Sequence, residues 1–143
     1  MNPNPQTAVL EPFPYQPETL SISRTQLWTG RVLSGIASIF FLLDGIMKLV
    51  KPAPVVQATL QLGYPESSIL SMGIVLLIST VLYMVPRTTI FGAVLLTAYL
   101  GGAVATNVRV SAPWFNIFFP VFFGCIVWAG LYLHDRRLRS ILS

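Results

Sequence analysis

Long apolar stretches alternate along the chain with short breaks that are rich in proline and charged residues. The breaks read KPAP, PRT and RVSAP. Each stretch is close to the roughly 20 residues that a helix needs to cross a hydrocarbon core of about 30 Å. Lipid offers no hydrogen-bond partner for open backbone groups, so helices and not isolated strands must cross it. The pattern predicts an all-α polytopic membrane protein, a bundle of four transmembrane helices over residues 28–50, 68–85, 89–108 and 114–133.

The connection between the first and second stretches is the only one long enough to form an element of its own. Within the segment APVVQATLQLGYPES, Pro54 suits the first turn of a helix, Gly63 suits a C-terminal cap and Pro65 prevents continuation. We therefore predict a short helix over residues 54–62. It has too few apolar residues to span, so we expect it at the membrane interface or against the mouth of the bundle.

The first part of the chain differs from the rest. Residues 1–23 contain five prolines, no basic residue and no apolar core, so we expect no signal peptide there. We predict that residues 1–27 form a disordered, proline-rich tail and that residues 28–143 form one membrane domain.

Composition supports the membrane assignment and narrows the function. Of the 143 residues, 54% are hydrophobic and only 10% are charged, and the mean hydropathy is +0.70. Such a chain is not a soluble domain, and its length leaves little room for a soluble catalytic module. The net charge of +4 resides at the ends of the apolar stretches and not in a polar patch, so we expect no nucleic-acid partner.

The basic residues also predict an orientation. An even number of spans places both ends of the chain on one side of the membrane. More basic residues fall on that side than on the other, where only Lys48, Lys51 and Arg109 lie. The positive-inside rule then predicts a protein of the cytoplasmic membrane with both termini in the cytoplasm. The basic residues on the side of the termini are Arg24, Arg31, Arg87, Arg136, Arg137 and Arg139.

An acid inside the first stretch is the clearest candidate for chemistry. Asp44 lies six residues before the predicted end of the helix, at a depth of about 9 Å. An unpaired charge at the bilayer centre costs about 2.5 to 3.5 kcal/mol, so a paired or inward-facing Asp44 is strongly favoured. Lys48 follows one turn later, in the favourable acid-before-base order. Further polar residues fall at the same level, and the predicted polar layer at the outer mouth is Asp44, Lys48, Glu66, Thr106, Asn107 and Arg109.

Two interpretations of this layer stay open. It is either a clasp of ion pairs and hydrogen bonds that fixes the helix register, or a small pocket under the short helix. A pocket there would bind a polar head group, a quinone carbonyl or a partner protein.

Other candidates for chemistry are weaker. His134 and Cys125 are the only histidine and the only cysteine, and neither has neighbours that would complete a metal site or a nucleophile. We expect no catalytic residue, no metal and no covalently bound cofactor. Four phenylalanines of the last stretch could line a quinone slot, but we expect them to face lipid instead: Phe118, Phe119, Phe122 and Phe123.

Several short motifs taken together resemble one family. The Asp44-Gly45-x-x-Lys48 stretch, GYPES, PRT and GGAVAT are similar to the DoxX-like membrane proteins, from about Gly30 to the C-terminus. This resemblance implies a four-helix membrane bundle and a link to quinone-dependent sulfur oxidation or other membrane oxidoreductase assemblies. Relatives commonly place a histidine where this chain has Asn107. If that histidine carries proton chemistry in relatives, Asn107 cannot perform it here.

The sequence thus favours an accessory subunit that binds a quinone or a lipid and supports a membrane oxidoreductase. An oxidoreductase subunit is the expected partner besides the bilayer, and a second copy of the chain is a further candidate. One alternative is a small proton-coupled transporter, although Asp44 lies off-centre and beside Lys48. A stand-alone membrane enzyme that acts on a lipophilic substrate is the other alternative.

Overall fold

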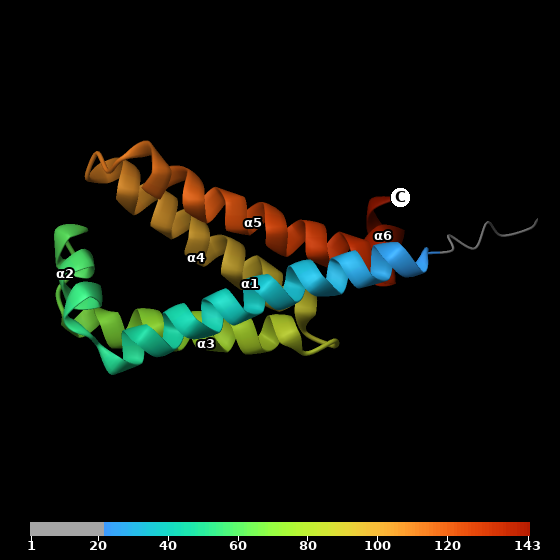
Figure 1. Cartoon of the computed structure of the whole chain (residues 1–143), viewed down its shortest axis with the longest axis horizontal. Coiled ribbons are helices and arrows are strands. Elements are labelled where there is room, and N and C mark those ends of the chain that lie inside the picture. The colour runs from blue at the N-terminus through green and yellow to red at the C-terminus, as the bar shows by residue number, and fades with distance from the viewer. Residues whose placement is uncertain (1–21) are drawn as a thin grey trace, which may run out of the picture.

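The computed structural model describes residues 22–143, and these residues form helices joined by short turns (Figure 1). Four helices are long and apolar enough to cross a membrane, namely α1, α3, α4 and α5. The predicted all-α fold with four spans is therefore confirmed. Residues 1–21 of the tail predicted over residues 1–27 lie outside the described residues. In order, the helices are α1 (Arg24–Val50), α2 (Ala53–Gln61), α3 (Ser67–Met84), α4 (Thr89–Arg109), α5 (Trp114–His134) and α6 (Arg136–Leu142).

Helix α1 begins earlier than the sequence pattern predicts. The Ser23 side chain accepts a hydrogen bond from the Gln26 backbone N–H at 3.2 Å, which is the geometry of an N-terminal cap. Residues 24–27 consequently belong to the first helix and not to the tail. The helix ends at Val50, and the capping residue Lys51 has a left-handed backbone (φ 53°) and donates its N–H to the Met47 carbonyl.

The short helix α2 lies across one end of the bundle, close to where the sequence predicts it (Figure 1). Gly63 follows it with φ +83°, a conformation that glycine adopts without strain. The Gly63 N–H donates to the Leu60 carbonyl, and the Tyr64 N–H donates to the Thr59 carbonyl. This closed cap turns the chain back toward α3. We call this end of the molecule the α2 end and the opposite one the α6 end.

The four long helices form a ring in which each packs against two neighbours. Helices α1 and α4 both pack against α3 and α5, so α1 and α4 are diagonal to one another. The shared core holds large apolar side chains that are almost fully buried. Many apolar side chains on the outer faces are exposed, as a bilayer requires. The core includes Phe41, Leu76, Leu96, Val127 and Leu131.

Glycines bring the helices close together at the α6 end. A Cβ on Gly30 of α1 would lie 2.9 Å from the Gly130 carbonyl oxygen of α5. A Cβ on Gly92 of α4 would lie only 2.1 Å from the Tyr83 backbone nitrogen of α3. Small residues at helix contacts permit this approach, which is the usual basis of packing in membranes.

Tyr83 joins three helices at the same end. Its hydroxyl donates to the Val127 carbonyl of α5 at 2.9 Å and lies 2.8 Å from the Ser34 hydroxyl of α1. Toward the α2 end, by contrast, α1 and α5 diverge (Figure 1). The bundle is therefore closed at the α6 end and open between α1 and α5 at the α2 end.

Candidate functional site

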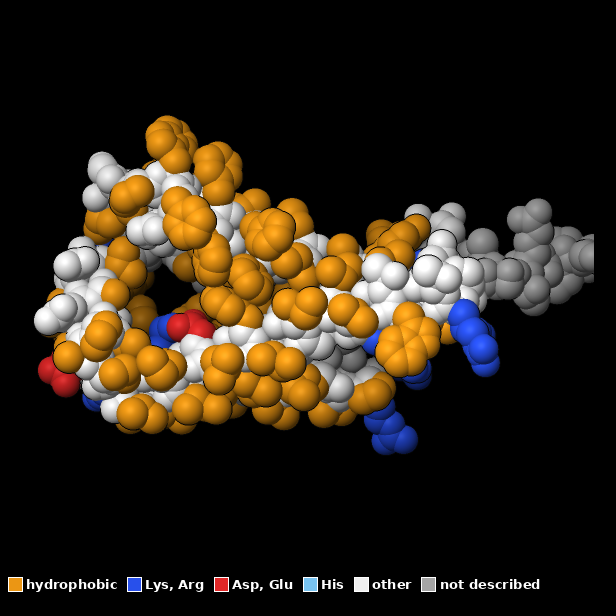
Figure 2. Space-filling model, in the orientation of Figure 1, with side chains coloured by type: hydrophobic (Ala, Val, Ile, Leu, Met, Phe, Trp, Pro, Cys, Tyr) orange, Lys and Arg blue, Asp and Glu red, His pale blue; other side chains and the backbone are white. Residues whose placement is uncertain are grey.

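A cavity of about 600 Å³ lies at the α2 end, and all four long helices and α2 contribute to its wall. Figure 2 shows this hollow between α2 and the long helices, with acidic and basic side chains at its edge. Pockets for small molecules usually measure about 300 to 1,000 Å³. The volume suits a ligand of moderate size.

An ion pair forms part of the wall. The Lys48 ammonium nitrogen lies 2.6 Å from each carboxylate oxygen of Asp44, one turn earlier on α1. The Lys48 side chain is 15% exposed and that of Asp44 is 37% exposed, and both line the cavity. The pair places two charged groups in the wall of the cavity.

Helix α4 adds further hydrogen-bonding groups. The Thr106 hydroxyl donates to the Gly102 carbonyl at 2.8 Å, so the Tyr64 hydroxyl, 2.8 Å away, donates to Thr106. The Asn107 side-chain amide nitrogen donates to the Ala103 carbonyl at 2.8 Å, and the Asn107 backbone carbonyl accepts from the Ala112 N–H. The Asn107 side-chain oxygen accepts no hydrogen bond from residues 22–143 and is available to a ligand.

Tyr99 supplies a second available group on the same face of α4. Its side chain lines the cavity, and its hydroxyl makes no hydrogen bond within the described part of the chain. The side chain is anchored in the wall while the hydroxyl is still able to donate and accept.

Aromatic rings form another part of the wall. The Phe40 ring of α1 stacks on Phe123 of α5, with the ring centroids 4.1 Å apart. Phe119 lies one turn before Phe123, with its centroid 5.5 Å from Phe40 and 5.0 Å from Phe123. Phe118 and Phe122 are exposed on the outer surface as expected. The expectation that Phe119 and Phe123 also face lipid is wrong, because α5 turns this pair inward.

The structure brings together four of the six residues predicted for the polar layer. Asp44, Lys48, Thr106 and Asn107 line the cavity, whereas Glu66 and Arg109 do not. Glu66 is exposed at the start of α3, where its side chain makes no capping hydrogen bond.

Arg109 supports the cavity from outside. Its guanidinium donates to the Leu62 carbonyl at 2.8 Å and lies 5.9 Å from the centre of the Tyr64 ring. Both contacts hold the segment that follows α2. Arg109 thus positions Leu62 and Tyr64, which line the cavity.

Several wall residues escaped the sequence reasoning. Tyr99 shares a helical face with Gly102 and Thr106, and that spacing could have identified it. Tyr64 follows the capping Gly63 and lines the cavity. Its position depends on the path of the loop, which the sequence pattern does not predict. The one-turn spacing of Phe119 and Phe123 was a usable signal for a common face.

The composition of the wall limits its chemistry. Its lining residues include no histidine and no cysteine, and residues 22–143 contain no cluster of three or more His, Cys, Asp or Glu side chains that could hold a metal. The groups present can donate and accept hydrogen bonds and can stack against a planar ring. This set of groups is suited to binding.

The described fold and the wall residues agree with the comparison with known families. A model of the DoxX-like family matches residues 32–130, which is more than half of the chain and includes Asp44, Lys48, Tyr99 and Asn107. No curated protein and no solved structure matches the chain. On the strength of this match and of the four membrane spans, the chain belongs to the DoxX-like family and is an integral membrane protein.

Proposed function

We propose that this protein is an accessory subunit of a membrane oxidoreductase system and that it holds a quinone in the cavity at the α2 end, with no catalytic centre of its own. One observation carries the proposal: the cavity joins an aromatic wall to a hydrogen-bonding wall inside a membrane bundle. A quinone needs both, because its head group is a planar ring that bears carbonyl oxygens.

The donors and acceptors suit both redox forms of such a head group. An oxidised quinone only accepts hydrogen bonds, and the Tyr99 hydroxyl and the Lys48 ammonium can donate them. A quinol also donates, and the Asp44 carboxylate and the Asn107 side-chain oxygen can accept. Binding both forms without reacting with them is the property expected of a subunit that positions a quinone for a partner.

The shape of the molecule offers a route for the ligand. Helices α1 and α5 diverge toward the α2 end (Figure 1), and the hollow is open in the same orientation in Figure 2. The Phe40 and Phe123 rings lie on these two helices. A lipophilic tail can pass between α1 and α5, on the α2 side of these stacked rings, into the bilayer while the head group stays inside.

The proposal includes an orientation with both termini in the cytoplasm. The α6 end carries most of the basic residues, which supports this orientation. A cysteine at Ser143, introduced with Cys125→Ala, should resist a membrane-impermeant thiol reagent in intact cells, whereas a cysteine at Ser67 should react. If only the cysteine introduced at position 143 reacted, the orientation would be the opposite of the proposed one.

Two adjacent glycines of α4 provide a matched test of the cavity. A Cβ on Gly101 or on Gly102 would meet no atom within 4 Å, but only Gly102 lines the cavity. Leucine has a better helix propensity than glycine by about 0.7 kcal/mol, so neither substitution should impair folding. Wild type and both leucine variants are purified in mild detergent, and bound quinones and lipids are quantified by mass spectrometry.

We expect wild type and Gly101→Leu to retain quinone and Gly102→Leu to lose it about tenfold, because the leucine side chain occupies the cavity. Equal quinone in all three proteins would place the quinone elsewhere. If Gly102→Leu lost a phospholipid and not a quinone, the ligand of the cavity would be a lipid and the quinone proposal would be wrong. Iron or haem in stoichiometric amount would contradict the absence of a catalytic centre, and cross-linking that captures no oxidoreductase subunit would contradict the accessory role.

A further inference from the structure

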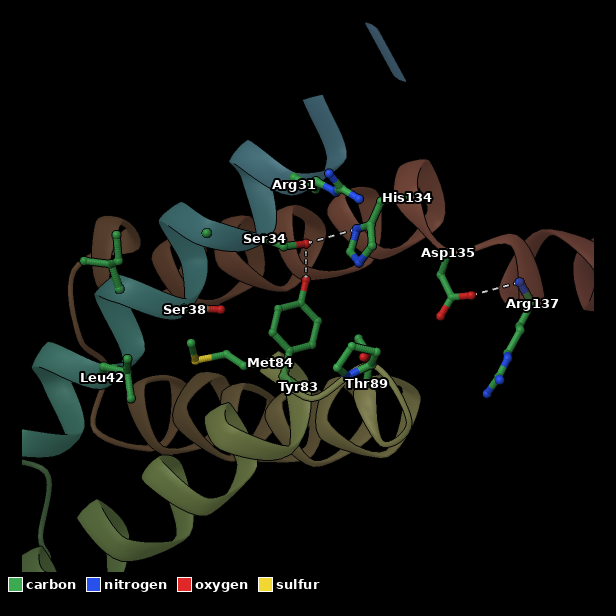
Figure 3. A pocket seen from close by; sticks show the side chains of 13 residues that line it. Arg31, Ser34, Ser38, Leu42, Tyr83, Met84, Thr89, His134, Asp135 and Arg137 are labelled. Atoms are coloured by element: carbon green, nitrogen blue, oxygen red, sulfur yellow. Dashed lines mark hydrogen bonds between the residues drawn. The ribbon is translucent and has the colours of Figure 1, made fainter. Parts of the chain in front are cut away.

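A second cavity, of about 730 Å³, lies at the α6 end between α1, the end of α3 and the junction of α5 and α6 (Figure 3). Its lining shares no residue with the cavity under α2. The proposed quinone site therefore does not account for it.

One end of this cavity is polar. Figure 3 shows Arg31, Ser34 and His134 gathered there, with the Ser34 hydroxyl between Tyr83 and the histidine. His134 Nδ1 lies 2.5 Å from the Gly130 carbonyl oxygen, which can only accept, so Nδ1 carries a proton. The Ser34 hydroxyl lies 3.5 Å from the same nitrogen.

Arg31 is the charge in this group that lacks a counterion. It forms no ion pair and no hydrogen bond with its side chain within residues 22–143. Asp135 also lines the cavity, but its carboxylate accepts the Arg137 backbone N–H at 2.8 Å and caps α6. With the Arg137 side chain, the lining has one positive charge in excess when His134 is neutral.

The other end of the cavity is apolar and continues onto the lipid-facing surface. Ile39, Leu42 and Met84 line it, and Ile39 is 62% exposed and Met84 is 54% exposed. Figure 3 shows Leu42 and Met84 on the side away from Arg31. The cavity therefore has a cationic end and an apolar end, and the apolar end opens to the lipid-facing surface.

We propose that this cavity binds an anionic membrane lipid, with the head-group phosphate at Arg31 and an acyl chain along Ile39, Leu42 and Met84. Arginine suits a phosphate because its planar fork donates two parallel hydrogen bonds. Basic pockets between membrane helices are a recurrent place for anionic head groups. The mixed lining distinguishes this ligand from a free phosphate ion, which would leave the apolar end unused.

The primary test needs no variant. The full-length protein in detergent is titrated with phosphatidylglycerol, with phosphatidylcholine and with sodium phosphate, and bound lipid is counted by native mass spectrometry while thermal unfolding is followed in parallel. We expect phosphatidylglycerol to bind at least about fivefold more tightly than phosphatidylcholine, the equivalent of ~1 kcal/mol for one basic side chain. Equal binding of the two lipids would overturn the proposal. Stabilisation by sodium phosphate equal to that by the anionic lipid would overturn the role of the acyl chain.

Two arginines then locate the site. Arg31→Gln removes the proposed contact, whereas Arg87→Gln removes an equal charge from the exposed α3–α4 turn at the same end, outside the cavity lining. We expect Arg31→Gln to lose the preference for phosphatidylglycerol about fivefold and Arg87→Gln to keep it. Arg31→Lys should restore part of it. Equal losses in Arg31→Gln and Arg87→Gln would show that the whole charged end attracts the lipid, which would contradict a built site.

Discussion

The Asp44–Lys48 pair allows the two interpretations of the polar wall to be separated. Asp44→Asn preserves the shape of the side chain and removes its charge. In the wild-type protein the Lys48 ammonium lies 2.6 Å from both carboxylate oxygens, and its side chain is only 15% exposed. The substitution leaves this partly buried ammonium without a counterion. If the pair holds the bundle together, the single variant must be less stable.

The burial of the two partners sets the expected magnitude. Breaking an exposed pair costs about 0.2 to 1 kcal/mol, and breaking a buried pair costs about 3 to 5 kcal/mol. Asp44 is 37% exposed, and Lys48 lies near the end of α1, where its long side chain can turn toward water. We therefore expect Asp44→Asn to lower the free energy of unfolding by about 2 kcal/mol.

A double-mutant cycle tests this value. Lys48→Met leaves the carboxylate unpaired and should cost a similar amount, whereas the double variant removes both charges and should recover most of the stability. The measurement is unfolding in mixed micelles with increasing dodecyl sulfate. Additive losses in the double variant, or single variants within about 0.5 kcal/mol of wild type, would refute a stabilising pair.

The amount of ligand bound to the same double variant decides whether the polar layer only fixes the helix register or forms part of a binding site. A stable double variant that retains less of the proposed quinone than wild type does would show that the charges contact the ligand. A stable double variant that retains quinone would show that the pair serves the bundle alone.

Two further predictions concern the helix packing at the α6 end and the segment that follows α2. Gly92→Ala places a Cβ 2.1 Å from the Tyr83 backbone nitrogen, so it should lower the free energy of unfolding by more than about 2 kcal/mol, whereas Gly35→Ala meets no atom within 4 Å and should not; equal melting temperatures would contradict this. Arg109→Ala removes the hydrogen bond to the Leu62 carbonyl, so amide hydrogen exchange in α2 should become faster while exchange in α4 stays unchanged. Unchanged exchange in α2 would show that Arg109 does not hold it.

The spans were predictable because each depends on its own sequence. Hydropathy over about 20 residues decides whether a segment crosses a bilayer, and the helices found agree with the expected ones to within a few residues. The short helix was predictable because Pro54 and Gly63 mark its two ends. The early start of α1 was not predicted, because the first turn of the helix begins with Arg24 and lies before the apolar stretch. Ser23, a residue type that often caps helices, was the available signal.

The cavity was only partly predictable because it depends on how helices cross. Asp44 and Lys48 could be paired from their spacing on one helix. That Phe119 faces Phe40 depends on the rotation of α5 against α1, which hydropathy does not encode. Glu66 lies at the expected level but outside the wall, because level along the membrane normal does not determine direction around a helix.

The Tyr83 junction gives the bundle a fixed pivot. Ser34 of α1 is held there, and Lys48 lies fourteen residues, or about 21 Å, further along the same helix. A rotation of α1 by about 3° at the pivot would displace Lys48 by about 1 Å over that lever arm. Substitutions at the Tyr83 junction should therefore alter the width of the cavity at the α2 end, because a small angular change there is enlarged along α1.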